Sequence, residues 1–577
     1  MFSLLISKSI ATSSVVLGLA NHLYLNRYEP TRTGVVRTAC LLLLEPVVQL
    51  FALNRLFSAN ISKSSIILAY FTFFASMATS IVLYRISPFH PLAKVPGPMI
   101  FKITKFWRMY ICWTGKQHIV LKELHNRYGP IIRSGPNDVS VIDRDSIKEV
   151  LGSEGLPKGP AYLSSSPVGV PPPLFGTNGQ EHTDRRRVWG RGFSSESIKE
   201  YQQIVIAKAN KLSEALSARA GKELDLTDWM TFFAFDFMAE MAFGTKTEML
   251  RHGKDDSGVI ELIHGAARFG EITSHVPWLT HLLTLFPSTN FLKMRKIALV
   301  WGSQRAARGS KTKDLWYHLV CLLFNKDHSS HSKEPSFATQ SDEEGREKVI
   351  PGRDLIVPDS LSAIIAGSDT TSTATANFFW CILSHPEVYK RIVSEVDKEY
   401  PPGTDPLLDT SRYGDLKFLK ACLNESLRFM PPVPSNGPRV VPKGSGGKMI
   451  CGHFITEGTQ VQVPPMCAHY NPDNFSPNPE SFIPERWIAE DSKAVFKGLP
   501  GPIIMKTDAF IPFSYGPANC VGKHLAMSEM MMLLTMLIQR FHFEFAKGFE
   551  WKEWPEKKVD AFLTINGPLK VIVKSKL

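Results

Sequence analysis

Apolar residues gather in three long stretches near the N-terminus, ahead of the segments whose apolar positions recur at helical spacing. Residues 64–84 contain no charged side chain and match the roughly 20 residues that a helix needs to cross a bilayer. The stretches 10–25 and 36–56 are weaker, because polar or charged residues interrupt them. The pattern predicts one membrane span at 64–84. It leaves open whether the first two stretches also cross, giving three spans, or lie against the membrane or the domain.

Residues 87–98 contain four prolines and a glycine, which predicts a stiff connector. We therefore expect a membrane anchor region at 1–86 and a catalytic domain at 99–577. Lys and Arg residues are frequent directly after the span, at Arg85, Lys94 and Lys102. Because such an excess is typical of the cytoplasmic face, the catalytic domain is expected in the cytosol.

Beyond the connector, most apolar positions recur at the spacing of helices, and short strands are expected near 131–142 and 448–464. Glu457–Gly458 is the expected hairpin turn in the second of these strand segments. Residues 328–348 are polar and charged, which predicts a surface loop. The expected fold class is mainly α with small β-sheets, and the longest predicted helix, 360–383, is apolar enough to be buried.

Composition narrows the kinds of site that this chain can form. Its 577 residues include eight cysteines with no CxxC spacing, which argues against a disulfide scaffold and against a Cys-rich zinc or iron–sulfur site. The net charge of +12 suits an anionic membrane surface or an acidic protein partner. No basic stripe alternates with aromatic residues, so a nucleic-acid partner is not expected.

One cysteine lies in a segment suited to binding a metal. In FSYGPANCVGKHLAM, residues 513–527, Gly516–Pro517 forces a turn and places Cys520 at the start of a helix. Backbone N–H groups at a helix start favour a thiolate, and a thiolate can bind haem iron axially. Gly522 would let a flat porphyrin approach the backbone, and Phe513 could shield the sulfur from water.

The long predicted helix has an unusual centre, AGSDTT at 366–371. A buried helix gains no stability from a glycine and an Asp–Thr pair, so a role in chemistry is expected. Gly367 would leave room for a ligand, and the Thr370 hydroxyl could compete for backbone hydrogen bonds. A polar kink between helices is the structural alternative.

Charged residues also recur in an otherwise apolar stretch near 416–430. Glu425 and Arg428 stand three residues apart, so their side chains meet on one helix face. The sequence PERW follows at 484–487 and contributes Arg486.

Taken together, these motifs resemble those of the cytochrome P450 family. The pattern F-x-x-G-x-x-x-C-x-G resembles its haem-binding signature, AGSDTT its oxygen-binding motif, and E-x-x-R with PERW its structural elements. The wider form around Cys520 resembles fungal membrane-bound, microsomal members. The resemblance implies a haem-thiolate fold over about 95–577 and haem b on Cys520. It also implies electrons from NADPH through NADPH–cytochrome P450 reductase, and a location in the endoplasmic reticulum membrane.

The resemblance further implies roles for individual residues. Thr370 would hydrogen-bond the oxygen bound at the iron, and Asp369 would feed protons through water as a general acid. Glu425, Arg428 and Arg486 would form a buried structural triad beside the haem.

Two haem carboxylates need donors, and the resemblance suggests where these lie. Arg439 matches a position that contacts one propionate, and His182 with Arg186 resembles a further pair. A solvated helix face is the alternative interpretation of that cluster, and the other candidates on the same helix are Arg185, Arg187 and Trp189. The family usually has a basic residue two positions before the cysteine, whereas this chain has Ala518.

Segments at the family's substrate-binding positions are mostly apolar or small, which favours a lipophilic substrate. These segments are 161–176, 364–366, 433–437 and 562–565. Residues 276–291 are expected to dip into the membrane and admit the substrate.

The sequence therefore predicts a monooxygenase that activates O₂ and inserts one oxygen atom into a lipophilic compound, in secondary metabolism such as terpenoid biosynthesis. Two rivals are a haem-thiolate isomerase or dehydratase that needs no O₂, and a non-catalytic haem- or lipid-binding membrane protein. The Asp369–Thr370 pair argues against both.

Overall fold

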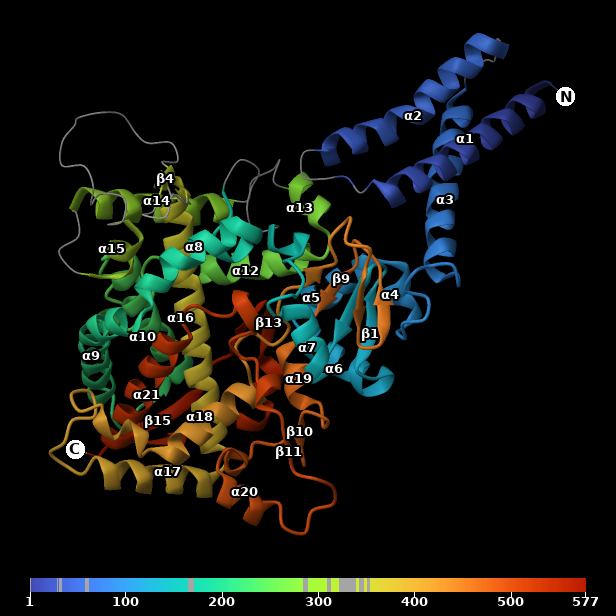
Figure 1. Cartoon of the computed structure of the whole chain (residues 1–577). Helices are drawn as coiled ribbons and strands as arrows, with labels where there is room; N and C mark the ends of the chain where they lie inside the picture. Colours follow the sequence, from blue (N-terminus) through green and yellow to red (C-terminus); the bar gives the residue numbers. More distant parts are fainter. Residues whose placement is uncertain are drawn as a thin grey trace.

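The structure is a computed structural model of the chain. It describes residues 2–28, 30, 34–57, 62–163, 171–283, 289–308, 313–320, 339–341, 347–349 and 353–576. Figure 1 shows a bundle of N-terminal helices that projects from a mostly helical body with small sheets. The expected fold class, mainly α with small β-sheets, is confirmed.

The projecting bundle consists of α1 (Phe2–Arg27), α2 (Gly34–Phe57) and α3 (Lys63–Ile86). By length and composition, the segments Gly34–Leu56 and Lys63–Ile86 are able to cross a membrane, and α1 is not in this class. Hydrogen bonds between side chains tie the helices together: Ser14 Oγ donates to Gln49 Oε1 at 2.9 Å, and His22 Nδ1 lies 2.7 Å from Ser80 Oγ. The bundle is therefore held by polar contacts as well as by apolar packing.

The connector packs on the catalytic part instead of standing free. Leu92 and Val95 are buried in an apolar cluster with strand residues that include Val139 and Val461. The backbone N–H of Arg133 also donates to the carbonyl of Pro96 at 2.6 Å. Structurally, the catalytic part therefore begins within the connector.

The helices of the catalytic part enclose a core around α16 (Arg353–Leu383), which crosses the body (Figure 1). Helix α16 begins before the expected position 360, because Pro358 is accommodated inside it. Its main neighbour is α10 (Leu226–Phe243), an almost wholly buried helix rich in phenylalanine. The remaining helices are α4 (Met99–Ile103), α5 (Lys105–Thr114), α6 (Gln117–Tyr128), α7 (Arg144–Leu151), α8 (Gly179–Gly192), α9 (Ser195–Ser217), α11 (Met249–His252), α12 (Val259–Ser274), α13 (Pro277–Leu283), α14 (Thr289–Arg308), α15 (Leu315–Val320), α17 (Pro386–Glu399), α18 (Lys417–Phe429), α19 (Pro465–Tyr470), α20 (Ala489–Val495) and α21 (Lys523–Arg540).

The strands form small sheets. The main sheet has the order β1-β2-β9-β6, and a second has the order β12-β15-β3. The strands are β1 (Ile131–Gly135), β2 (Asp138–Val141), β3 (Glu223–Asp225), β4 (Thr339–Ser341), β5 (Glu347–Val349), β6 (Arg439–Val440), β7 (Lys448–Ile450), β8 (His453–Ile455), β9 (Gln460–Gln462), β10 (Phe475–Ser476), β11 (Ile504–Met505), β12 (Phe541–Phe545), β13 (Val559–Ala561), β14 (Leu563–Ile565) and β15 (Lys570–Ser575).

The predicted hairpin turn at Glu457–Gly458 is wrong. Strand β8 pairs with β7 through a turn at Cys451–Gly452, whereas β9, which follows Gly458, pairs with β2 and β6. Cys451 and Gly452 both have positive φ, 50° and 71°, as a tight hairpin turn of the primed type requires. The expected loop at 328–348 lies mostly outside the described residues, and its described parts belong to the paired strands β4 and β5.

Candidate active site

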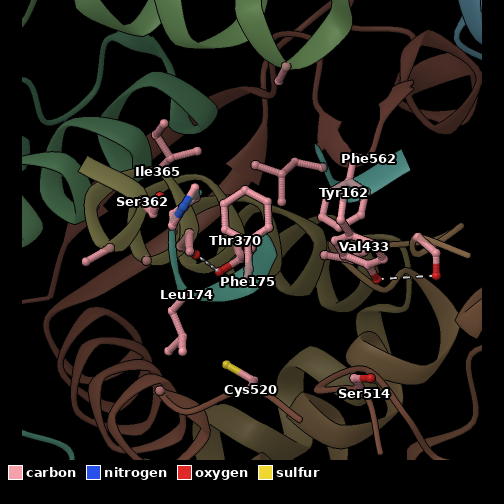
Figure 2. A pocket seen from close by; sticks show the side chains of 18 of the residues that line it. Tyr162, Leu174, Phe175, Ser362, Ile365, Thr370, Val433, Ser514, Cys520 and Phe562 are labelled. Atoms are coloured by element: carbon pink, nitrogen blue, oxygen red, sulfur yellow. Dashed lines mark hydrogen bonds between the residues drawn. The ribbon is translucent and has the colours of Figure 1, made fainter. Parts of the chain in front are cut away.

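A cavity of about 1390 Å³ lies in the catalytic part, and its described wall is mostly apolar. Helix α16 forms one side, and the loop that leads into α21 forms the opposite side. Figure 2 shows the sulfur of Cys520 pointing into this space, with Thr370 and Leu174 among the other side chains that line it. The cavity therefore brings together the two sequence motifs that the resemblance linked to a haem.

Cys520 precedes α21 instead of starting it, since the helix begins at Lys523 and Gly522 is its N-cap. Cys520 is accessible from the cavity, which lies inside the catalytic part, and the protein encloses it on its other sides. Burial raises the pKa of the thiol, while hydrogen bonds from the backbone N–H groups of Gly522 and Lys523 and the charge of Arg186 act to lower it. The loop thus stabilises a thiolate only in part, and a bound metal ion would lower the pKa of the thiol further.

Backbone geometry shapes the loop around the cysteine. The N–H of Cys520 donates to the carbonyl of Phe513 at 2.9 Å, which closes the loop. Gly516 has a φ of 72°, and a Cβ there would collide with the carbonyl of Leu151, so only glycine fits. A Cβ on Gly522 would meet only ordinary contacts, the nearest with Phe193 at 3.5 Å, so packing within the protein does not require this glycine.

The centre of α16 contacts both the cavity and the neighbouring helix α10. Thr370 lines the cavity, and its hydroxyl donates to the carbonyl of Ala366 at 2.6 Å. Gly367 lines the cavity, and a Cβ added to it would collide with the side chain of Met238 on α10. The glycine lets the two helices approach closely.

Asp369 is 6% exposed and faces α12, where His264 Nε2 lies 3.6 Å from its Oδ1. The imidazole is 32% exposed, whereas Oδ2 of the aspartate is buried without a hydrogen-bond partner among the described residues. The sequence analysis did not identify His264, because no motif links a residue on α12 to the AGSDTT segment of α16. The pair connects a buried carboxylate to the protein surface.

Basic residues from three segments meet at one edge of the cavity. His182 and Arg186 on α8, Arg439 on β6, and Lys158 all line its wall. Of the other α8 candidates, Trp189 also lines the cavity. Its indole N–H and the Arg185 guanidinium both donate to Asp359 of α16, at 3.1 and 2.6 Å, and Arg187 pairs with Asp184 at the surface. The spacing of four residues places His182 and Arg186 on the same helix face.

The positive charges of Lys158, Arg186 and Arg439 repel one another, so a bound anion would stabilise this cluster. Burial, followed by the charges of Lys158, Arg186, Arg439 and Arg185, lowers the pKa of His182 to about 4. Arg439 Nε is buried with no hydrogen-bond partner in the described part of the chain. Two carboxylates on a flat, apolar cofactor would satisfy this cluster, so the residues fit haem: Cys520 for its iron and the cations for its propionates.

The structure brings Glu425, Arg428 and Arg486 together in the interior. Arg428 Nε and Nη2 donate to the two carboxylate oxygens at 2.9 and 2.8 Å, and Arg486 Nε donates to Oε1 at 3.0 Å. Glu425 also accepts the indole N–H of Trp487 at 2.9 Å. Every oxygen of this buried carboxylate is therefore satisfied, as a stable buried ion network requires.

His469 joins this network to the cysteine loop, a link that sequence reasoning missed. Its Nδ1 lies 2.9 Å from the carbonyl of Arg428, and its Nε2 accepts the N–H of Ile511 at 2.9 Å. Ile511 lies two residues before Phe513, where the loop that contains Cys520 begins. The triad thus braces the loop through a chain of hydrogen bonds.

The cavity wall includes parts of each expected substrate segment. Tyr162, Leu174, Ile365, Val433 and Phe562 line it (Figure 2), whereas Ile364 is buried in the protein core. Residues 164–170 lie outside the described residues.

The expected membrane-dipping segment, 276–291, includes α13 and the start of α14, and its residues 284–288 lie outside the described part. Trp278 and Leu283 on α13 are 37% and 39% exposed. Leu283 also lines the cavity, so this helix joins the cavity to an exposed apolar surface.

Comparisons with known proteins agree with this geometry. The family model "Cytochrome P450" matches residues 94–573. Cytochrome P450 monooxygenase cpaH of Aspergillus oryzae is 30% identical over 483 residues, which cover 82% of this chain and 87% of the relative. Cytochrome P450 67 of Uromyces fabae is 27% identical over 583 residues, with 97% and 99% covered. Trichothecene C-15 hydroxylase of Fusarium sporotrichioides is 29% identical over 503 residues, with 85% and 94% covered.

Proposed function

Because this chain belongs to the cytochrome P450 family, we propose that Cys520 holds the haem iron in the cavity and that the monooxygenase acts on a lipophilic compound of secondary metabolism. The protein is a cytochrome P450 monooxygenase with a haem cofactor. The observation that carries the proposal is the Cys520 sulfur in a large apolar cavity, facing Thr370 across it. When bound, the haem supplies two-electron reductive activation of O₂ and insertion of one oxygen atom into a substrate C–H bond.

The chain's own residues control protons at this centre. Thr370 offers its hydroxyl at the cavity wall, and its bond to Ala366 orients the oxygen. Asp369 passes protons inward from His264, which reaches solvent and lies 3.6 Å away. The unpartnered Asp369 Oδ2 leaves the carboxylate free to bind a water on that route.

The cavity wall selects the substrate class. Its lining is mainly apolar, and Tyr162 and Asn436 provide a few polar groups for orientation. A compound of this kind partitions into membranes, which matches the apolar helices α2 and α3 and the exposed α13. We place the protein in the endoplasmic reticulum membrane, with residues 1–86 as its anchor. The electron donor is NADPH–cytochrome P450 reductase, whose acidic surface the +12 charge would attract.

Cys520→Ser tests the central assignment. The wild-type protein, reduced and exposed to carbon monoxide, should show the absorption band of a haem thiolate, and the variant should lack it and lose NADPH-dependent product formation. Cys467→Ser, at a buried cysteine outside the cavity wall, is the matched control and should keep the band. A variant at Cys520 with an unchanged spectrum contradicts the assignment.

A further inference from the structure

We propose that Lys158 provides the propionate contact that the family usually takes from the basic residue two positions before the cysteine, where this chain has Ala518. The inference rests on the proposed function, because it concerns the haem that Cys520 would hold. Ala518 lines the cavity with a methyl group only, so the wall at this point lacks a donor. The missing charge must come from elsewhere in the fold.

Arg186 only partly replaces it. Its guanidinium donates to the neighbouring Asn519, with Nη1 at 2.6 Å from the carbonyl oxygen and Nη2 at 2.8 Å from the side-chain oxygen. Two of its donor nitrogens are therefore committed to the cysteine loop. Arg439 supplies one further cation at this edge, and another is needed to replace the basic residue that is missing at Ala518.

Lys158 is held at this place by its backbone. Its N–H donates to Asn178 Oδ1 at 2.8 Å, and Asn178 Nδ2 donates to its carbonyl at 3.1 Å. An antiparallel bridge joins Lys158 to Arg439. Because Asn178 directly precedes α8, these contacts fix the lysine between the helix that carries Arg186 and the strand that carries Arg439.

The ammonium group has no acidic partner in the part of the chain that the structure describes. Lys158 is 8% exposed and lines the cavity, and its Nζ donates to the carbonyl of Thr177 at 3.2 Å. Burial and the charges of Arg439, Arg186 and Arg185 lower its pKa to about 7. A buried cation among other cations is costly, and an anion bound among them would relieve the repulsion.

The acids of the cavity wall do not supply this anion. Glu271 accepts a hydrogen bond from Gln117 Nε2 at 2.8 Å. Burial raises the pKa of Glu529 to about 8, so its carboxyl is neutral at pH 7. Neither forms an ion pair with Lys158 within the described ranges, so we infer that a bound molecule supplies the compensating charge.

The experiment measures how fast the ferric full-length enzyme loses haem to an excess of a haem-scavenging apoprotein. Lys158→Met should accelerate the loss about tenfold or more, since a charge-assisted hydrogen bond is lost. Lys158→Arg should lose haem at close to the wild-type rate. Adding Ala518→Arg to Lys158→Met should restore slow loss, because it returns a cation to the position usual in the family.

The controls separate this inference from the proposed function. Lys313→Met removes an exposed lysine and should leave the rate unchanged. If Lys158→Met binds no haem at all, recovery of haem by the added Ala518→Arg supports the inference and failure to recover overturns it. An unchanged rate of haem loss in Lys158→Met also overturns the inference. If the rate is unchanged and only the binding of a fatty-acid probe weakens, the lysine contacts the substrate instead of the haem. A variant that overturns the inference but keeps the thiolate spectrum leaves the proposed function intact.

Discussion

At the scale of single residues, the site depends on polar groups placed on opposite sides of one helix. Thr370 lines the cavity, whereas its neighbour Asp369 turns away from it toward His264. Successive residues of a helix point about 100° apart, so one helix can place a hydroxyl inside the cavity and a carboxylate behind it. The histidine gives this buried acid a polar partner that is partly exposed to solvent.

His264→Ala should therefore slow proton delivery and uncouple the reaction. We expect product formed per NADPH consumed to fall roughly 3- to 30-fold, with more hydrogen peroxide released, because a proton relay contributes less than a direct acid catalyst. Product, peroxide and NADPH are measured together across pH 6–8. His252→Ala, which removes a surface histidine 2.9 Å from Asp256, is the control. Unchanged coupling and an unchanged pH profile in His264→Ala would falsify the relay.

At the scale of elements, a braced set of segments holds the cysteine loop. Helix α18 supplies Glu425 and Arg428, the short helix Pro484–Trp487 supplies Arg486, and His469 at the end of α19 carries the contact to Ile511. Removing one member of a buried ion network leaves the other charges uncompensated. The loop conformation is thus linked to the stability of this network.

Glu425→Ala should yield protein without bound haem. Loss of the buried carboxylate should lower the free energy of unfolding by about 3–5 kcal/mol. Haem content per chain and the midpoint of thermal unfolding are the measurements. Glu553→Ala, which breaks an exposed pair with Lys557, should cost at most about 1 kcal/mol and keep the haem. Normal haem content in Glu425→Ala refutes the triad's role.

At the scale of the whole molecule, the helical bundle α1–α3 and the catalytic body meet at a connector that belongs to the body. Leu92 and Val95 are 1% and 2% exposed, because they pack against the main sheet. The family match begins at residue 94, within the same segment. We therefore expect that the helices up to residue 86 can be removed without disturbing the core, and that the connector cannot.

Two truncations test this boundary. Deleting residues 2–86 should release the protein from membranes and keep the thiolate spectrum. Deleting residues 2–98 should lower the free energy of unfolding by about 3 kcal/mol or more, because a buried leucine and a buried valine are lost. Sedimentation, the carbon monoxide spectrum and thermal unfolding distinguish the two variants. Equal stability of both would place the boundary after residue 98.

The sequence alone determined the features that local spacing encodes. The loop residues Gly516 and Cys520, the Asp369–Thr370 pair and the Glu425–Arg428 pair were all identifiable, because a turn or a single helix fixes how such neighbours lie. The membrane-length helix after Lys63 was also evident, since its length and lack of charge reflect the bilayer.

Only the tertiary structure decided how distant segments combine. It gathered Lys158, Arg186 and Arg439 at one edge of the cavity, and it placed His264 behind Asp369. It also showed that Gly367 serves the packing of α10 against α16, and that the turn between β7 and β8 is not the expected one. These relations depend on contacts between residues far apart in the chain, and hydrophobic periodicity specifies which face is buried but not which partner buries it.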